Sequence, residues 1–175
     1  MGGRNKALLQ LEAQTFLARL EQSLSDFGEK LISVRDASWL ENSAFTPVPD
    51  QISGRGPLEG LRCALNACRS DALIVVPCDV PLFSSELARA LISAGENFDA
   101  AVCRDRTGRI HPLCGMYAKS CLPAIESMLA QENYRIMDML DRVRSTVLSL
   151  EDAKLPDSLL TNVNDPSSLE ALRRL

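Results

Sequence analysis

Apolar residues along the chain follow two alternating spacings. Short unbroken apolar runs are typical of strands, and they alternate with segments whose apolar residues recur every three or four positions, as on one face of a helix. The strand candidates are 30–34, 45–49, 72–76, 99–103, 113–117 and 146–150. The helix candidates are 15–24, 58–68, a segment capped by Ser84 or Ser85, 120–129, 136–143, and a last helix with Asp165 as cap and Pro166 at its first position. This alternation predicts a three-layer α/β/α sandwich with a mostly parallel sheet.

The run Ala72–Val76 is the strongest strand candidate. It contains only Ala, Leu, Ile and Val, which predicts a strand buried on both faces of a parallel sheet. Ligands of open parallel sheets gather beyond the carboxyl ends of the strands. We therefore look for chemistry directly after this run and after the other strand candidates.

Length and composition indicate one globular domain over residues 1–175. The chain is 46% hydrophobic and has a net charge of -4, which is too acidic for a general nucleic-acid binder that neutralises phosphates over its surface. No apolar stretch approaches the roughly 20 residues that span a bilayer. The amino-terminal residues lack the apolar core of a signal peptide. We therefore expect no nucleic-acid partner, no membrane association and a cytoplasmic location.

The cysteines and the single histidine favour structural roles. No two of the six cysteines form a C-x-x-C pair, and His111 is the only histidine, so a zinc site is not supported. We expect most of the cysteines to be small buried apolar residues in a reducing compartment. His111 precedes Pro112 in a strand candidate, which favours a hydrogen-bonded structural histidine. Any Ser-His-Asp or Cys-His mechanism would have to use it.

The segment after the strongest strand candidate carries a carboxylate between two prolines. Asp79 lies in Pro77-Cys78-Asp79-Val80-Pro81, where it can ligate a hard cation such as Mg²⁺ and, through it, a phosphate. The alternative is that Asp79 only forms an Asx turn. The segment alone does not decide between these.

Two glycine-containing segments are further candidates. Ser53–Gly60 runs from a strand end into a helix, and glycines and free N–H groups at a helix start favour a bound anion, although such turns are also ordinary loop punctuation. Asp50 stands just ahead of it, where it accepts hydrogen bonds from a base or ribose or faces solvent. Lys6 follows Gly2 and Gly3 and is either a phosphate contact or a solvated terminal lysine.

In this order, the segments resemble the molybdenum cofactor guanylyltransferases, which join GMP to molybdopterin and belong to the nucleotidyltransferases with a Rossmann-like fold. Residues 1–9 match the second half of the family signature L-A-G-G-x-S-x-R-M-G-x-x-D-K-A-L-L. The G-P-L-x-G, P-C-D-x-P, P-L-x-x-x-Y and N-x-N-x-P-x-D-L segments resemble 56–60, 77–81, 112–117 and 162–169.

The resemblance implies the substrates GTP and molybdopterin, and pyrophosphate as a product. Asp79 would hold Mg²⁺ on the nucleotide phosphates, and Lys6 would neutralise charge on the departing pyrophosphate. Asp50 would contact the nucleoside, while the backbone around Gly56 and Leu58 would shape the nucleotide pocket.

Molybdopterin would be bound by the second half of the chain. The candidate contacts are Arg135, Asn162 and Asn164, and the alternative for the asparagines is a turn ahead of the last helix. The resemblance also implies molybdenum-insertion proteins and molybdoenzyme chaperones as protein partners.

The chain departs from the family pattern at its start. The first strand and the L-A-G-G half of the nucleotide loop are absent, Asn5 replaces an aspartate, and an asparagine is missing from Ser33-Val34-Arg35. The first strand would be central, so its removal would leave two neighbouring strands unpaired and expose their apolar faces. We expect either a start assigned too far downstream or a shortened form with an incomplete nucleotide site.

Two other functions stay open. One is another nucleotidyltransferase of the same fold that uses CTP or a sugar phosphate, because a fold and a magnesium site do not choose the base. The other is a non-catalytic protein that handles the molybdenum cofactor without the nucleotide loop.

Overall fold

The computed structural model describes residues 5–40, 43–164 and 166–172. The helices are α1 (Phe16–Ser23), α2 (Gly56–Ala67), α3 (Ser85–Gly95), α4 (Leu122–Ala130), α5 (Ile136–Leu140) and α6 (Pro166–Leu172). The strands are β1 (Gln10–Leu11), β2 (Gln14–Thr15), β3 (Leu31–Val34), β4 (Thr46–Pro49), β5 (Ala72–Val75), β6 (Ala100–Arg104), β7 (Ile110–Ala118) and β8 (Ser145–Ser149). Each predicted strand and helix is confirmed, while the proposed cap Asp165 lies outside the described residues.

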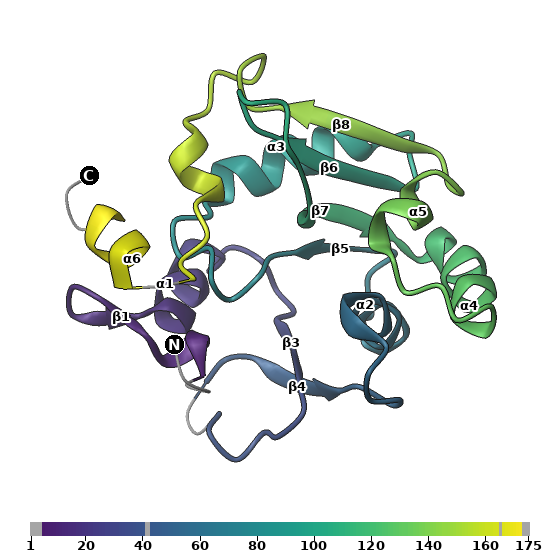
Figure 1. The fold of residues 1–175 in the computed structure, drawn as a ribbon, viewed down its shortest axis with the longest axis horizontal. Coiled ribbons are helices and arrows are strands. Elements are labelled where there is room, and N and C mark those ends of the chain that lie inside the picture. Colours follow the sequence, from purple (N-terminus) through teal and green to yellow (C-terminus); the bar gives the residue numbers. More distant parts are fainter. Residues whose placement is uncertain (1–4, 41–42, 165, 173–175) are drawn as a thin grey trace.

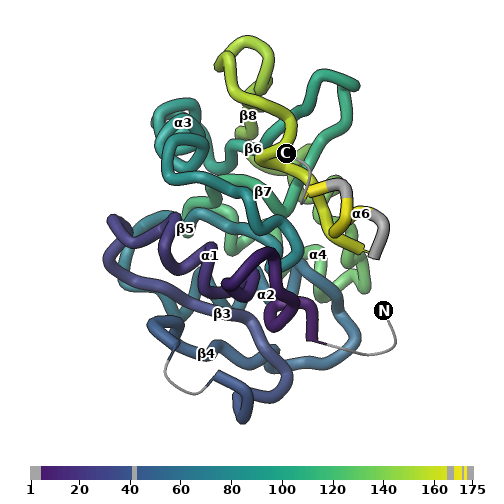
Figure 2. Tube along the Cα trace, turned by 90° about the vertical axis from the view of Figure 1, so that its left-hand side faces the viewer, coloured from purple at the N-terminus to yellow at the C-terminus, as the bar shows by residue number. Residues whose placement is uncertain are grey.

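The strands form two main sheets. The larger has the order β5-β7-β6-β8, and β3 pairs with β4 in a separate two-stranded sheet. The β3–β4 and β6–β8 pairs are parallel, whereas β7 runs antiparallel to β5 and β6. Figures 1 and 2 show helices on both sides of these strands, with α3 on one side and α2 and α4 on the other. The predicted three-layer α/β/α architecture is confirmed.

The alternation of side chains along β6 builds the two halves of the core. Ala101 and Cys103 face the cluster that contains Leu87 and Leu91 of α3. Ala100 and Val102 face the opposite cluster. Since successive strand residues point to opposite faces, one strand fills both layers. That second cluster includes Leu61, Leu65, Ile125, Met128 and Tyr117.

Local sequence signals account for the helix starts. The Thr15 hydroxyl accepts a hydrogen bond from the Ala18 N–H at 3.1 Å, and the Ser84 hydroxyl accepts one from the Leu87 N–H at 3.2 Å. Both contacts are side-chain caps of otherwise unpaired helical N–H groups. Ser84 is thus the cap that the sequence left open between two serines.

Strand β5 differs from its prediction in its burial and in its pairing, since the only described strand that pairs with it, β7, is antiparallel. The strand forms, but all of its residues are half-buried rather than buried on both faces. The reason is its position at the end of the larger sheet, where only β7 pairs with it. Its other edge lines a cavity.

The histidine and most cysteines are structural, as predicted. His111 Nε2 lies 2.8 Å from Asp105 Oδ2, and this hydrogen bond holds the pKa of Asp105 well below its usual range. Five cysteines are buried free thiols, and Cys78 is half-buried. Burial raises the pKa of Cys121 to about 11, which keeps this thiol protonated and unreactive at neutral pH.

Candidate functional site

Three segments far apart in the sequence meet beyond the carboxyl end of β5. Lys6 Nζ donates hydrogen bonds to Asp79 Oδ2 at 2.8 Å and to Asn164 Oδ1 at 2.5 Å. We call Lys6, Asp79 and Asn164 the lysine cluster. Side-chain exposure is 40% for Lys6 and 15% for Asp79, so the ammonium group is reachable from solvent while the carboxylate is held by its surroundings.

Backbone contacts fix the lysine cluster. The Val80 N–H donates to the Pro77 carbonyl at 3.1 Å and the Val163 N–H donates to the Asp79 carbonyl at 2.8 Å. Val80 and Val163 are both fully buried. The buried valines therefore anchor the two loops from which Asp79 and Asn164 project.

Asn5 sets the position of Lys6. Its side-chain oxygen accepts a hydrogen bond from the Ala7 N–H at 3.1 Å and caps the short 3-10 helix Lys6–Leu8. Asparagine performs this capping as well as aspartate. The replacement of the family's aspartate by Asn5 thus preserves the local structure.

The lysine cluster has a donor set suited to a divalent cation. Asp79 Oδ2 and Asn164 Oδ1 converge on one point, which the Lys6 ammonium takes. Carboxylate and amide oxygens are hard ligands, and Mg²⁺ typically takes one or two carboxylates with phosphate oxygens and water in its remaining positions. Among the described residues, no group of three or more His, Cys, Asp or Glu side chains could hold a metal alone. A cation here would therefore depend on oxygens from the substrate.

Cys78 does not supply a nucleophile beside the lysine cluster. Burial, and after it the negative charge of Asp79, raise the pKa of the Cys78 thiol. A thiol must be deprotonated to attack. The groups of this site that can act on a ligand are therefore its charged and hydrogen-bonding side chains.

A second group of polar residues lies where β3 and β4 end. The Ser33 hydroxyl donates to Asp50 Oδ1 at 3.0 Å. Gly60 of α2 lies against this pair, because a Cβ at that position would come within 2.9 Å of Ser33 Oγ. Ser33, which lies in the stretch where the family's asparagine is missing, thus orients Asp50.

The start of α2 borders the same region. Gly56 has φ of +65°, a conformation that favours glycine, and opens the helix. Leu58 is completely buried in the core and does not line the cavity described below, whereas Gly56 does. The roles of Gly56 and Leu58 in shaping a nucleotide pocket stay predictions.

Glu59 is a residue that sequence reasoning missed. It is the only buried charged side chain among the described residues. Its carboxylate accepts hydrogen bonds from Arg62 at 2.7 and 3.1 Å and from the Ile52 N–H at 3.2 Å. Arg62 also donates to Gln51 Oε1 at 2.9 Å. The pair therefore ties the loop after Asp50 to α2, and the Arg62 hydrogen bonds lower the pKa of Glu59.

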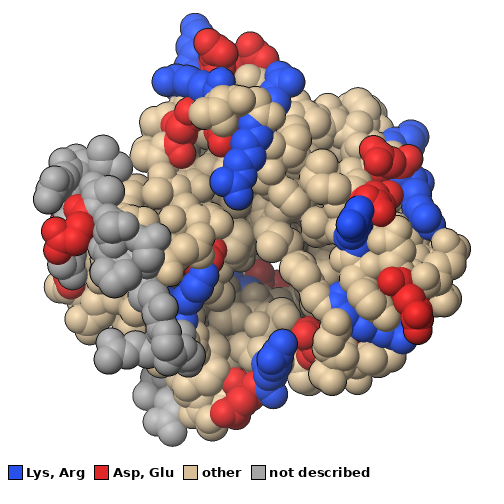
Figure 3. All heavy atoms as spheres, in the orientation of Figure 1, with Lys and Arg blue, Asp and Glu red and all other residues tan. Residues whose placement is uncertain are grey.

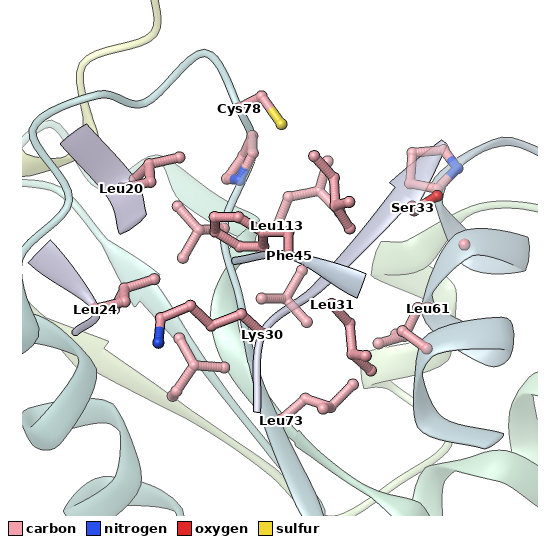
Figure 4. Close-up of a pocket in the computed structure, with 18 of the residues that line it drawn as sticks. Leu20, Leu24, Lys30, Leu31, Ser33, Phe45, Leu61, Leu73, Cys78 and Leu113 are labelled. Atoms are coloured by element: carbon pink, nitrogen blue, oxygen red, sulfur yellow. The ribbon is translucent and has the colours of Figure 1, made fainter. Parts of the chain in front are cut away.

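A cavity of about 520 Å³ is lined by Ser33 and Asp50 but by no member of the lysine cluster. Asp50, Gly54 and Gly56 line it, as does Cys78, the neighbour of Asp79. Figure 3 shows this face hollowed near its centre, with acidic and basic side chains around the rim. Most of the lining is apolar, and Figure 4 shows Leu20 and Leu24 on one side and Leu61 on the other.

The predicted molybdopterin contacts do not lie together. Asn164 belongs to the lysine cluster with two predicted nucleotide residues, and Asn162 is next to the buried Val163. Arg135 is exposed at the start of α5, and α5 lies near α4, across the molecule from α1 and α6 (Figure 1). The structure thus does not support a simple division of the chain into a nucleotide half and a pterin half.

The described residues contain no helix that is long and apolar enough to cross a membrane.

The fold and the grouping of charged residues at the strand ends define an α/β protein of the nucleotidyltransferase class. Residues 1–147 match the model of the MobA-like NTP transferase domain. The chain is 32% identical, over 181 residues, to a probable molybdenum cofactor guanylyltransferase of Carboxydothermus hydrogenoformans, covering 99% of this chain and 89% of the relative. The chain therefore belongs to the MobA-like NTP transferase family.

Solved structures share the fold. Molybdopterin-guanine dinucleotide biosynthesis protein A from Archaeoglobus fulgidus superposes with a TM-score of 0.82 at 21% identity, over 98% of this chain and 90% of that one. A Mycobacterium tuberculosis protein described as a manganese complex superposes with a TM-score of 0.67 at 18% identity, over 99% and 94%.

Proposed function

We propose that this protein transfers GMP from GTP to molybdopterin, forming the guanine dinucleotide cofactor and releasing pyrophosphate. The observation that carries the proposal is the convergence of Lys6, Asp79 and Asn164 beyond β5 in a chain of the MobA-like NTP transferase family. The relatives named as molybdenum cofactor guanylyltransferases support this choice of substrates.

The lysine cluster would act on the phosphates. Asp79 and Asn164 would hold a divalent cation, for which we propose Mg²⁺. Such a cation neutralises phosphate charge when bound. Lys6 would then leave Asp79 Oδ2 and Asn164 Oδ1 and pair with the departing pyrophosphate. An ammonium on a flexible stem can make this exchange without moving the backbone.

The transfer itself requires no protein nucleophile. A terminal phosphate oxygen of molybdopterin attacks the α-phosphorus of GTP, a new P–O bond forms, and the bond from the α-phosphorus to the β-bridging oxygen breaks in line. Pyrophosphate leaves with both electrons of that bond. Such reactions depend on positioning and charge stabilisation, which agrees with the protonated state of the Cys78 thiol.

Asp50 favours GTP over CTP. Ser33 holds Oδ1 of the carboxylate, so Asp50 presents a fixed acceptor beside the cavity. Guanine carries two adjacent N–H donors, on N1 and on the 2-amino group, which match an acceptor-only carboxylate, whereas cytosine carries an acceptor, N3, beside its one amino donor. The Glu59–Arg62 pair would support this contact by fixing the loop after Asp50.

Roles for Arg135 and Asn162 in binding molybdopterin belong to the proposal too. So do molybdenum-insertion proteins and molybdoenzyme chaperones as partners.

Competition binding tests the proposal. A fluorescent GTP analogue bound in the presence of Mg²⁺ is displaced by unlabelled GTP or CTP, and product formation from GTP and molybdopterin is followed by mass spectrometry. We expect GTP to compete at least about 10-fold better than CTP, because a mismatched polar edge costs 1–3 kcal/mol. Equal competition, or CMP transfer at the same rate, would contradict the assignment of GTP.

A further inference from the structure

Strand β7 carries a bulge in the middle of its pairing with β6. Val102 of β6 is opposite Gly115, and the next residue of β6, Cys103, is opposite His111. The three residues of β7 between these pairs therefore have no counterpart in β6. We call Pro112–Cys114 the β7 bulge. Bulges change the direction of side chains and are often found beside active sites.

Contacts at both ends hold the β7 bulge in place. The Tyr117 hydroxyl donates a hydrogen bond to the Pro112 carbonyl. On the other side, His111 is hydrogen bonded through Nε2 to Asp105 in the turn between β6 and β7. Gly115 is needed where the two strands come close, because a Cβ there would lie 2.6 Å from a backbone oxygen of β6. The bulge is therefore a fixed part of the fold.

The Tyr117 side chain connects the bulge to the core. It is completely buried and belongs to the same core cluster as Ile125 and Met128 of α4. A buried hydroxyl needs a hydrogen-bond partner, and the Pro112 carbonyl is the one that it has. Because the surrounding core holds the ring, this hydrogen bond fixes Pro112 relative to α4.

The β7 bulge lies alongside the segment that carries Asp79. Val75, the last residue of β5, is opposite Gly115 in the antiparallel register. The chain beyond Val75 therefore runs past the residues that precede Gly115, which are those of the bulge. Leu113 of the bulge lines the same cavity as Cys78 (Figure 4).

Cys114 places the bulge near the other neighbour of Asp79. Cys114 belongs to the same buried cluster as Val80. Burial, and after it the negative charge of Asp79, raise the pKa of the Cys114 thiol to about 12. Because the interaction between charges weakens with distance, this effect agrees with a short separation of Cys114 and Asp79. The bulge thus shares its surroundings with both chain neighbours of Asp79, Cys78 and Val80.

We propose that Tyr117 is a positioning residue for the lysine cluster. Its hydrogen bond to Pro112 holds the β7 bulge, and the bulge holds the segment around Asp79 where a cation and nucleotide phosphates would bind. The inference rests on the proposed function for these ligands, whereas the position of Asp79 can be measured without them. Displacement matters because a shift of about 1 Å can cost on the order of 10²-fold in rate.

Tyr117→Phe tests the proposal, because it removes the hydroxyl and keeps the buried ring. Tyr134→Phe is the matched control, since Tyr134 is half-buried and lies outside β7. Ile125→Val controls for a loss of stability. It removes one methyl group from the core cluster that contains Tyr117 and lies in α4, outside the bulge.

Amide hydrogen exchange, measured by NMR without ligands, reports the position of Asp79. The Val163 N–H donates to the Asp79 carbonyl at 2.8 Å, so displacement of this segment breaks its hydrogen bond. The amide of Leu65, inside α2, is the reference for global unfolding. We expect exchange at Val163 to accelerate roughly 10-fold relative to Leu65 in Tyr117→Phe, and to stay unchanged in both controls.

GTP is then titrated by calorimetry with and without Mg²⁺. The ratio of the two affinities reports the cation site and does not change with the overall stability of a folded variant. We expect this ratio to fall by at least about 3-fold in Tyr117→Phe and to keep its wild-type value in Tyr134→Phe and Ile125→Val.

Leu113→Ala repeats both measurements from within the bulge if Tyr117→Phe does not fold, and the same changes are expected. An unchanged Mg²⁺ ratio in the folded variant would overturn the proposal, as would unchanged exchange at Val163 or equal effects in Ile125→Val. If wild type shows no Mg²⁺-linked GTP binding, the proposed function fails, while accelerated exchange at Val163 still supports the positioning of Asp79 by Tyr117.

Discussion

Two strands of the larger sheet show how strand pairing controls burial. β6, at an internal position of the larger sheet, has four fully buried residues, whereas every residue of β5 at the open edge is half-buried. The two strands have similarly apolar sequences. The difference therefore arises from their neighbours and not from their own composition.

The candidate site lies along the border between the packed core around β6 and the cavity beside β5. Asp79 follows β5, Asp50 follows β4, and both segments reach the cavity that separates the sheets. One side of the site is thus fixed by a packed core, while the other faces a groove. We expect changes in the packed region to affect stability most and changes along the border to affect ligand binding.

The largest expected effect is the difference in unfolding free energy lost when a leucine is truncated in the packed core and when one is truncated beside the cavity. Leu87→Ala in the packed core removes a completely buried side chain and should cost about 2–5 kcal/mol of unfolding free energy. Leu31→Ala beside the cavity should cost roughly 1 kcal/mol, because the side chain is only half-buried. Urea denaturation of both variants measures the difference. Equal losses would show that the groove region is packed as tightly as the core.

Asp79→Asn should leave the fold intact and lower turnover by on the order of 10²-fold. The substitution is nearly isosteric but removes the charge that a divalent cation would require. Product formation at saturating GTP measures the effect, with exposed Asp141→Asn as the control. Near-normal turnover of the Asp79 variant would remove this residue from the mechanism.

Arg135→Ala tests whether molybdopterin and GTP bind at separate places on the molecule. It removes an exposed guanidinium that can donate hydrogen bonds to the pterin ring and should weaken molybdopterin binding by roughly 1–3 kcal/mol. GTP affinity should be unchanged, because α5 lies across the molecule from α1 and α6 (Figure 1), and Lys6 and Asn164 belong to segments next to these two helices. Calorimetric titration of each ligand tests this. A loss confined to GTP would be contrary to the assigned role.

Glu59→Gln should reduce stability in a pH-dependent manner. The pKa of Glu59 is lowered, chiefly by its hydrogen bonds with Arg62, so its contribution is fully present above the unfolded-state pKa of about 4.3. The contribution is lost as the pH falls from there through the lower folded-state pKa. The stability difference from wild type should therefore shrink between about pH 5 and pH 3.

Denaturation of the Glu59 variant at several pH values checks this prediction, with exposed Glu151→Gln as the control. A difference that stays constant or grows on acidification would refute it.

The sequence predicts the elements well because their signals are local. Apolar spacing identifies each strand and helix, and the capping serines and threonines mark helix starts. The segments with Lys6, Asp50 and Asp79 are also visible as motifs. Asn5 replaces an aspartate without loss of the cap because both side chains carry an acceptor oxygen at the same distance from the backbone.

What the sequence does not predict depends on distant contacts. Lys6 and Asn164 meet across 158 positions, and no local pattern indicates that distance to be short. The half-burial of β5 depends on its place at the end of the larger sheet, where only β7 pairs with it. Glu59 lies three residues before Arg62, a spacing that is typical of exposed helical pairs, and only the packing of the loop after Asp50 buries it.

Magnesium-linked GTP binding tests the central claim most directly. GTP is titrated into wild-type protein and Asp79→Asn by calorimetry, each with and without Mg²⁺. If Asp79 holds the cation against the phosphates, Mg²⁺ should raise the GTP affinity of wild type by roughly 10-fold or more and raise that of the variant far less. An equal enhancement in both proteins, or none in wild type, would contradict the claim that the lysine cluster is the nucleotide phosphate site.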